Sequence, residues 1–208
     1  MRSTLSASTR ELPLFPLRTV LFPDGLLELK IFEARYLDLM SRCMREASPF
    51  GVACLLSGGE AGTSLDPVRL HEAGTLAELI EVDSAQAGIL LVRCRGTHRF
   101  ALGDTRRQAD GLWVGDASEM PDDALAAPAP AHANAVKSLA DAIASLAAQG
   151  VTPFLEPHRL DSAGWVANRW CELLPLPLPA KQSLMALADP VARLDIVDSL
   201  LRSRHRMQ

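Results

Sequence analysis

The chain has 208 residues, of which 48% are apolar and 22% charged, and its formal net charge is −4. This composition is typical of a globular protein with one large or two small domains. The acidic balance argues against a nucleic-acid binder, which usually carries a basic surface. No apolar run approaches the roughly 18 residues of a membrane span, and residues 1–11 lack the apolar core of a signal peptide. We therefore expect a cytoplasmic protein with no nucleic-acid or membrane partner.

Residues 12–36, LPLFPLRTVLFPDGLLELKIFEARY, form the most apolar part of the chain. An exposed tail would not carry so many large apolar side chains, and a central helix would not carry three prolines. The pattern predicts a buried, kinked strand, a turn at Pro23-Asp24-Gly25 and a partner strand over residues 26–31. A helix is expected to begin near Glu33 and to end before Ser48-Pro49. Its apolar face would consist of Phe32, Tyr36, Met40, Cys43 and Ala47.

Short apolar or alternating segments separated by glycines and polar residues follow this helix and predict strands. Within one of them, we expect Leu76, Ile80 and Val82 to share a mostly buried face. Seven or eight strands and one helix would precede residue 120, and closing them into a small barrel would remove exposed edges. The predicted strands cover residues 50–56, 68–71, 75–82, 89–95, 99–102 and 112–118.

The composition changes at residues 120–131, where proline, alanine and aspartate dominate. Beyond this segment the periodicity is helical, with a helix over 132–149, one capped by Asp161-Ser162, one over 180–188 and a last helix opened by Asp189-Pro190. We therefore predict an α+β fold with three parts: a β-barrel domain (1–120), a linker (121–131) and an α-helical bundle domain (132–208).

The sequence carries no convincing catalytic, metal or cofactor motif, so none of these sites is predicted. The glycine-rich loop at residues 58–64 has no lysine for a nucleotide phosphate, and His71-Glu72 lacks the second histidine of an HExxH zinc site. The four cysteines are widely spaced, as in buried thiols of a reducing compartment. Because catalytic triads assemble from distant positions, an unrecognised hydrolase stays open as a remote alternative.

Glu33 and Arg35 interrupt the most apolar segment and have two interpretations. They could contact a bound peptide at the mouth of the domain, or they could form a structural ion pair, which we favour. The aromatic residues Phe15, Phe22 and Phe32 are likewise expected in the core more than in a binding surface. The candidate peptide-binding residues are Phe15, Phe22, Glu33, Arg35 and Tyr36.

The opening segment resembles the N-terminal substrate-binding domain of the Lon protease family, through LPLFPL, LFP-x-G and L-x-IFE-x-RY in order. Further matching segments continue the resemblance from about Glu11 to about Leu201. They are Phe50-Gly51-Val52, the EAGTLA of residues 72–77, the GTHRF of residues 96–100, the KQSLM of residues 181–185 and Ala192-Arg193-Leu194.

This resemblance implies a PUA-like pseudo-barrel followed by a helical bundle, and a module that binds unfolded or extended polypeptide. Such a module would act as an adaptor or chaperone-like protein, with a protease or chaperone as partner, and would bind in an apolar groove between barrel and bundle. The family's ATPase and serine–lysine peptidase motifs are absent from the sequence, so no enzyme activity is expected. The alternative is a small-molecule or RNA-binding module, since PUA-like barrels elsewhere bind RNA.

Overall fold

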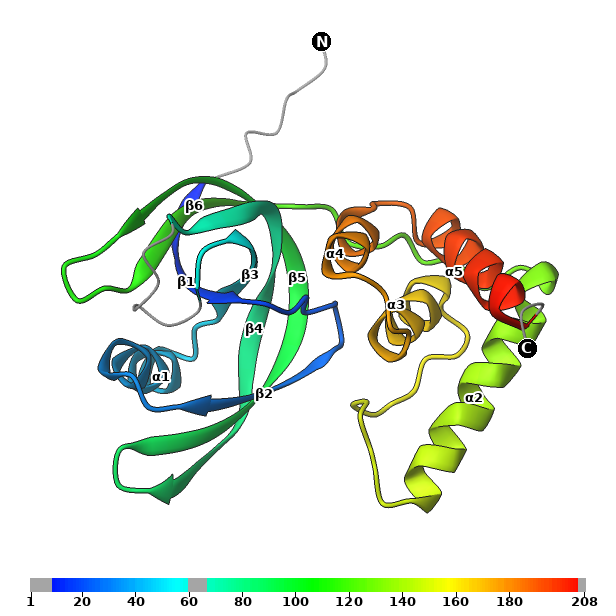
Figure 1. Ribbon diagram of the computed structural model, residues 1–208, viewed down its shortest axis with the longest axis horizontal. Coiled ribbons are helices and arrows are strands. Elements are labelled where there is room, and N and C mark those ends of the chain that lie inside the picture. Colours follow the sequence, from blue (N-terminus) through cyan, green and yellow to red (C-terminus); the bar gives the residue numbers. More distant parts are fainter. Residues whose placement is uncertain (1–8, 60–66, 206–208) are drawn as a thin grey trace, which may run out of the picture.

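The computed structural model describes residues 9–59 and 67–205 and shows a β-rich part followed by a helical part (Figure 1). The predicted α+β class is confirmed. The loop predicted at residues 58–64 lies mostly outside these ranges, and residues 1–8 lie outside them entirely. The elements are β1 (Arg10–Leu17), β2 (Leu26–Ile31), α1 (Ala34–Glu46), β3 (Phe50–Ser57), β4 (Arg69–Gln86), β5 (Ile89–Arg107), β6 (Trp113–Glu119), the 3-10 helix η1 (Pro130–His132), α2 (Ala133–Ala148), α3 (Ala163–Leu173), α4 (Leu178–Ala186) and α5 (Pro190–His205).

Within the six-stranded sheet, all strands except β2 form a closed ring. β1 is parallel to β3 and antiparallel to β6, β4 lies between β3 and β5, and β6 returns to β5. Closure satisfies the backbone groups that an open sheet would leave at its edges. The barrel predicted from the pattern of strands is therefore confirmed.

β2 has the predicted bounds but pairs with β5 and not with the opening strand. The chain reverses at the predicted turn, where Asp24 adopts a left-handed φ of 58° and the Gly25 amide donates to the Phe22 carbonyl oxygen at 2.9 Å. The Asp24 amide then donates to the Gly96 carbonyl oxygen of β5 at 2.8 Å. The predicted pairing of the two opening strands is wrong, because long-range contacts set strand pairing and a local pattern does not contain them.

Two pairs of predicted strands are single long strands, β4 and β5, so the sheet has six strands instead of seven or eight. The glycines interpreted as breaks lie inside these strands, at places of close packing. A Cβ atom on Gly74 would lie 2.4 Å from the Phe100 ring, and one on Gly96 would lie 2.3 Å from the Phe22 carbonyl oxygen. These glycines allow tight contacts and do not end strands.

The helix α1 lies where predicted and buries Tyr36, Met40 and Cys43 against the barrel. Its expected face is wrong at both ends. Phe32 precedes the helix and is 62% exposed, and Ala47 is the exposed C-cap that follows it. Ile80 is also exposed, because an irregularity between Leu79 and Glu81 shifts the pairing of β4 with β5 and changes which side chains face the core.

The helical part packs on the β1–β2 connection. Trp165 and Val166 of α3 share one apolar core with Val20 and Phe22, and Figure 1 shows α3 and α4 facing the barrel. The predicted caps are confirmed at Ser162, whose Oγ accepts from the Trp165 amide, and at the start of α5. The boundaries predicted at 120 and 131 remain a prediction. No helix in the described ranges is long and apolar enough to cross a membrane.

Candidate functional site

Four of the five residues predicted as peptide-binding candidates are buried in the barrel and its junction with the helices, and the fifth, Glu33, is half-buried. The rings of Phe15 and Tyr36 stack with their centroids 4.0 Å apart, and Phe22 is 1% exposed in the core shared with the helices. Arg35 pairs with Glu33 at 2.7 Å and donates to the Gly111 carbonyl oxygen at 2.8 Å. The favoured structural ion pair is confirmed. A role of these five residues in peptide binding stays a prediction, and their burial leaves little surface for a ligand.

A hollow with both apolar and polar side chains lies between the end of α1 and the middle of β4. It is a hollow of about 630 Å³, which we call the α1–β4 groove. Met44 of α1 is 51% exposed and Ile80 of β4 is 47% exposed, so two large apolar side chains face solvent at this place. The groove is lined by Cys43, Met44, Ala47, Ser48, Glu78, Leu79, Ile80, Glu81 and Val82.

The groove runs along a strand edge that no described strand covers. The pairing of β3 with β4 begins at Phe50 opposite Ala77, and from Glu78 onward β4 pairs with β5 alone. The second edge of β4 therefore has backbone amide and carbonyl groups available beside Met44 and Ile80. An edge of this kind can accept an extended peptide as an additional strand.

The rim of the α1–β4 groove is acidic. Glu81 pairs with Arg93 at 3.1 Å, and Arg93 also contacts Glu28 of β2 at 3.3 Å. Glu78 makes no ion pair or hydrogen bond with any described residue. A ligand with a basic residue beside its apolar residues would complement this rim.

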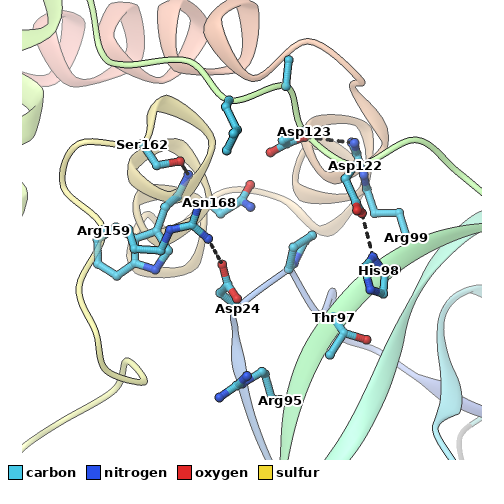
Figure 2. A pocket seen from close by; sticks show the side chains of 14 residues that line it. Asp24, Arg95, Thr97, His98, Arg99, Asp122, Asp123, Arg159, Ser162 and Asn168 are labelled. Atoms are coloured by element: carbon cyan, nitrogen blue, oxygen red, sulfur yellow. Dashed lines mark hydrogen bonds and ion pairs between the residues drawn. The ribbon is translucent and has the colours of Figure 1, made fainter.

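The predicted site between barrel and helices exists as a cavity of about 370 Å³, which we call the junction pocket (Figure 2). We expected apolar walls, but charged side chains dominate them. They come from the β1–β2 turn, β5, the segment before η1 and the connection that precedes α3. His98 pairs with Asp122 at 2.8 Å and Arg159 with Asp24 at 3.3 Å. The lining residues are Pro23, Asp24, Arg95, Thr97, His98, Arg99, Asp122, Asp123, Ala124, Leu125, Arg159, Ser162, Trp165 and Asn168.

Buried arginines hold the two sides of the junction pocket together. Arg99 of β5 contacts Asp123 at 2.9 Å and donates to the Leu187 carbonyl oxygen behind α4 at 2.9 Å. From α3, Arg169 donates to the backbone carbonyl oxygens of Pro23 and Asp24. These bonds cross between barrel and helices, so the pocket has a fixed frame.

The described residues offer no evident reactive centre. They contain no group of three or more histidine, cysteine or acidic residues that could hold a metal ion. Burial raises the pKa of Cys54 to about 11 and the pKa of Cys94 and Cys171 to about 12, which keeps these thiols protonated and poorly nucleophilic.

The residues that form the groove and the pocket were not predicted from the sequence. The groove joins residues 43–48 with residues 78–82, and four of its side chains, Cys43, Ala47, Ile80 and Val82, were expected on buried faces. The pocket collects residues from four separate segments, and only its place at the junction was predicted. One feature of the sequence could have pointed to the pocket. The consecutive acidic residues Asp122-Asp123 are unusual in a segment whose composition is otherwise typical of a linker.

Comparisons with known proteins agree on one family. The family model of the ATP-dependent protease La (LON) substrate-binding domain matches residues 11–203. The crystal structure of a Lon N-terminal domain protein from Xanthomonas campestris is similar, with 34% identity and a TM-score of 0.73 over 90% of this chain and 96% of that one. The N-terminal domain of a Mycobacterium avium complex Lon protease shares the fold, with 16% identity, a TM-score of 0.64 and the same coverage. No curated protein sequence matches, and no ATPase or peptidase domain is found in the chain.

Proposed function

The chain belongs to the Lon substrate-binding domain family, and we propose that it binds extended segments of unfolded polypeptide in the α1–β4 groove. One observation carries this proposal: the free edge of β4 lies beside two exposed apolar side chains, Met44 and Ile80. The bound segment would place its backbone along Glu78–Val82 and its apolar side chains in the groove.

The energetics favour short, extended and partly apolar segments. Each apolar side chain that becomes fully buried contributes about 1.5–3 kcal/mol, and each backbone hydrogen bond contributes about 1 kcal/mol net. The irregularity of β4 near Ile80 limits a regular ladder to a few residues. It therefore also protects this edge from open-ended pairing with other chains.

In this proposal the protein has an adaptor or chaperone-like role in a reducing, cytoplasmic setting, which suits its four unpaired cysteines. It would hold an unfolded segment and present it to a protease or chaperone partner. The acidic rim of the groove supports segments whose apolar residues are flanked by lysine or arginine.

Fluorescence anisotropy with a labelled, extended apolar peptide tests the proposal. Met44→Glu and Ile80→Glu should each weaken binding by about tenfold, because about 1.4 kcal/mol of apolar contact is lost and a carboxylate is buried in its place. The matched control is Ile196→Glu, since Ile196 of α5 is 45% exposed and lies outside the groove.

Three results would contradict this assignment: no saturable binding of any unfolded peptide, equal loss in the Ile196→Glu control, or unchanged affinity in both groove variants. A single-stranded RNA of the same length serves as a competitor. If the RNA displaced the peptide, the alternative nucleic-acid function would replace the one proposed here.

A further inference from the structure

The α1–β4 groove contains the most exposed methionine that the structure describes. Met44 of α1 is 51% exposed, whereas Met40 and Met185 are 0% and 2% exposed and Met120 is half-buried. The sulfur of Met185 also accepts a hydrogen bond from Thr75 Oγ1 at 3.6 Å. An oxidant reaches an exposed side chain before a buried one, so oxidation of methionine should begin at Met44.

The neighbouring thiol does not compete with Met44 for the oxidant. Cys43 also lines the groove, but it is 3% exposed and burial raises the pKa of its thiol. Peroxides react with the thiolate and hardly with the protonated thiol, so Cys43 reacts slowly at neutral pH. The two sulfur atoms therefore differ in reactivity although their residues are adjacent in α1.

The wall of the groove suits a thioether better than a sulfoxide. The acidic side chains Glu78 and Glu81 accept hydrogen bonds when ionised and cannot donate them, and the Ser48 hydroxyl is the strongest donor among the lining side chains. A sulfoxide oxygen on Met44 would therefore take its hydrogen bonds mainly from water. A bound apolar segment would displace that water, and the lost hydration would weaken binding.

We propose that Met44 is a reversible oxidation site that closes the α1–β4 groove to polypeptide. This inference rests on the proposed function, because it concerns regulation of the same groove. The oxidised side chain is polar, so the groove loses one of the two exposed apolar side chains, Met44 and Ile80, that carry the proposed binding. Coupling is reciprocal, so a bound segment should also shield Met44 from the oxidant.

The oxidant in this proposal is a peroxide. A lone pair of the Met44 sulfur attacks one peroxide oxygen, the O–O bond breaks and an S–O bond forms. With hydrogen peroxide, the proton of the transferred hydroxyl passes to the departing oxygen, which leaves as water. A methionine sulfoxide reductase reverses the change with a dithiol, which is oxidised to a disulfide while the sulfoxide oxygen leaves as water.

The oxidation should leave the fold intact. Figure 1 shows α1 on the side of the barrel that is farther from the helical part. The sulfoxide of Met44 would face water, whereas oxidation of Met40 or Met185 would place a polar group in the core. Urea denaturation should therefore give the same midpoint before and after oxidation of Met44, which shows that any loss of binding is local.

The test begins with graded treatment by hydrogen peroxide, and mass spectrometry of proteolytic peptides measures the sulfoxide at each methionine. We expect Met44 to be oxidised first, Met120 more slowly, and Met40 and Met185 only after unfolding. Catalase then removes the peroxide, and anisotropy with a methionine-free, extended apolar peptide measures binding. The affinity should fall about tenfold in parallel with the sulfoxide at Met44, and reductase with dithiothreitol should restore it.

Met44→Leu keeps an apolar side chain in the groove and removes the oxidisable sulfur. Its affinity after peroxide is compared with its own affinity before peroxide, and the two should be equal. The matched control is Met120→Leu, because Met120 lies outside the groove and this variant should lose affinity as the unmodified sequence does. If Met44→Leu lost as much affinity on treatment as the control, the inference would be overturned.

Protection by the peptide separates failure of this inference from failure of the proposed function. At about ten times Kd, roughly one tenth of the groove is free, so oxidation of Met44 should slow about tenfold and that of Met120 should not change. If the peptide protects Met44 but binds the oxidised protein equally well, the inference fails and the proposed function stands. If Met44 is oxidised first and no unfolded peptide binds in either state, the proposed function fails, and Met44 is an oxidation site without this role. Oxidation of Met120 before Met44 overturns the modification site itself.

Discussion

Arg193 of α5 forms a bidentate contact with the carboxylate of Asp123. Its Nη1 donates to Oδ2 at 2.7 Å, and its Nη2 donates to Oδ1 at 3.0 Å. Arg99 of β5 contacts the same carboxylate at 2.9 Å. One aspartate in the connecting segment thus joins the barrel to the last helix. Both arginines are almost fully buried, at 2% and 1% exposure, so each needs this partner to offset its desolvation.

Asp123→Asn should therefore lower the free energy of unfolding by about 3 kcal/mol, because it leaves two buried cations with neutral acceptors in place of a carboxylate. Urea denaturation followed by tryptophan fluorescence measures the loss. The matched control is Asp122→Asn, the adjacent residue in an exposed pair with His98, which should change stability by less than about 0.5 kcal/mol. Equal effects of the two substitutions would mean that the buried network does not hold the junction.

The strand glycines make a second, steric prediction. Gly96→Ala places a methyl group 2.3 Å from the Phe22 carbonyl oxygen, and Gly74→Ala places one 2.5 Å from the Val52 carbonyl oxygen. Backbone atoms cannot move aside easily, so each should destabilise the fold by about 1–3 kcal/mol in the same urea assay. Gly103→Ala is the control on β5, since its nearest contact is an ordinary 3.4 Å. If Gly96→Ala left the free energy of unfolding unchanged, the β1–β2 turn would be able to move the Phe22 carbonyl oxygen away from the added methyl group.

These glycines also show where sequence reasoning reaches its limit. The opening strand, turn and helix could be predicted because proline, glycine and apolar spacing act locally, and so could the helix starts at Ser162 and Asp189. Whether Gly74 ends a strand or accommodates the Phe100 ring depends on a residue 26 positions away. The exposure of Ile80, and with it the candidate groove, follows from a pairing irregularity that leaves no trace in the local pattern.

The four cysteines should react slowly in the native protein. All are unpaired and buried, and burial raises the pKa of each thiol, to about 12 for Cys94 and Cys171. A thiol-exchange reagent at neutral pH should therefore label almost none of them before unfolding and all of them in denaturant. Ala147→Cys, on an exposed position of α2, supplies the positive control. Rapid labelling of any native cysteine would reveal local opening of the core around it.

Glu172 gives the stability of the fold a specific dependence on pH. Burial raises the pKa of its carboxyl group from 4.5 to about 7, against the opposing influence of Arg169, which contacts it at 2.8 Å. The folded protein then binds more protons than the unfolded chain between these values. The contribution of Glu172 to stability is therefore largest below about pH 4.5 and declines as the pH rises to about 7, by at most about 3 kcal/mol.

Glu172→Gln should make this decline smaller. Urea denaturation gives the free energy of unfolding at about pH 5 and about pH 8, and the difference between the two values should be smaller in the variant. His98 also makes the protein less stable as the pH rises. Its hydrogen bond to Asp122 raises its pKa, and the stability that this bond contributes is lost as the pH rises through the raised pKa. The comparison is therefore made in a His98→Gln background, where only Glu172 differs. An unchanged slope in the double variant would mean that the carboxyl group of Glu172 is ionised across the whole range and that Arg169, not burial, controls it.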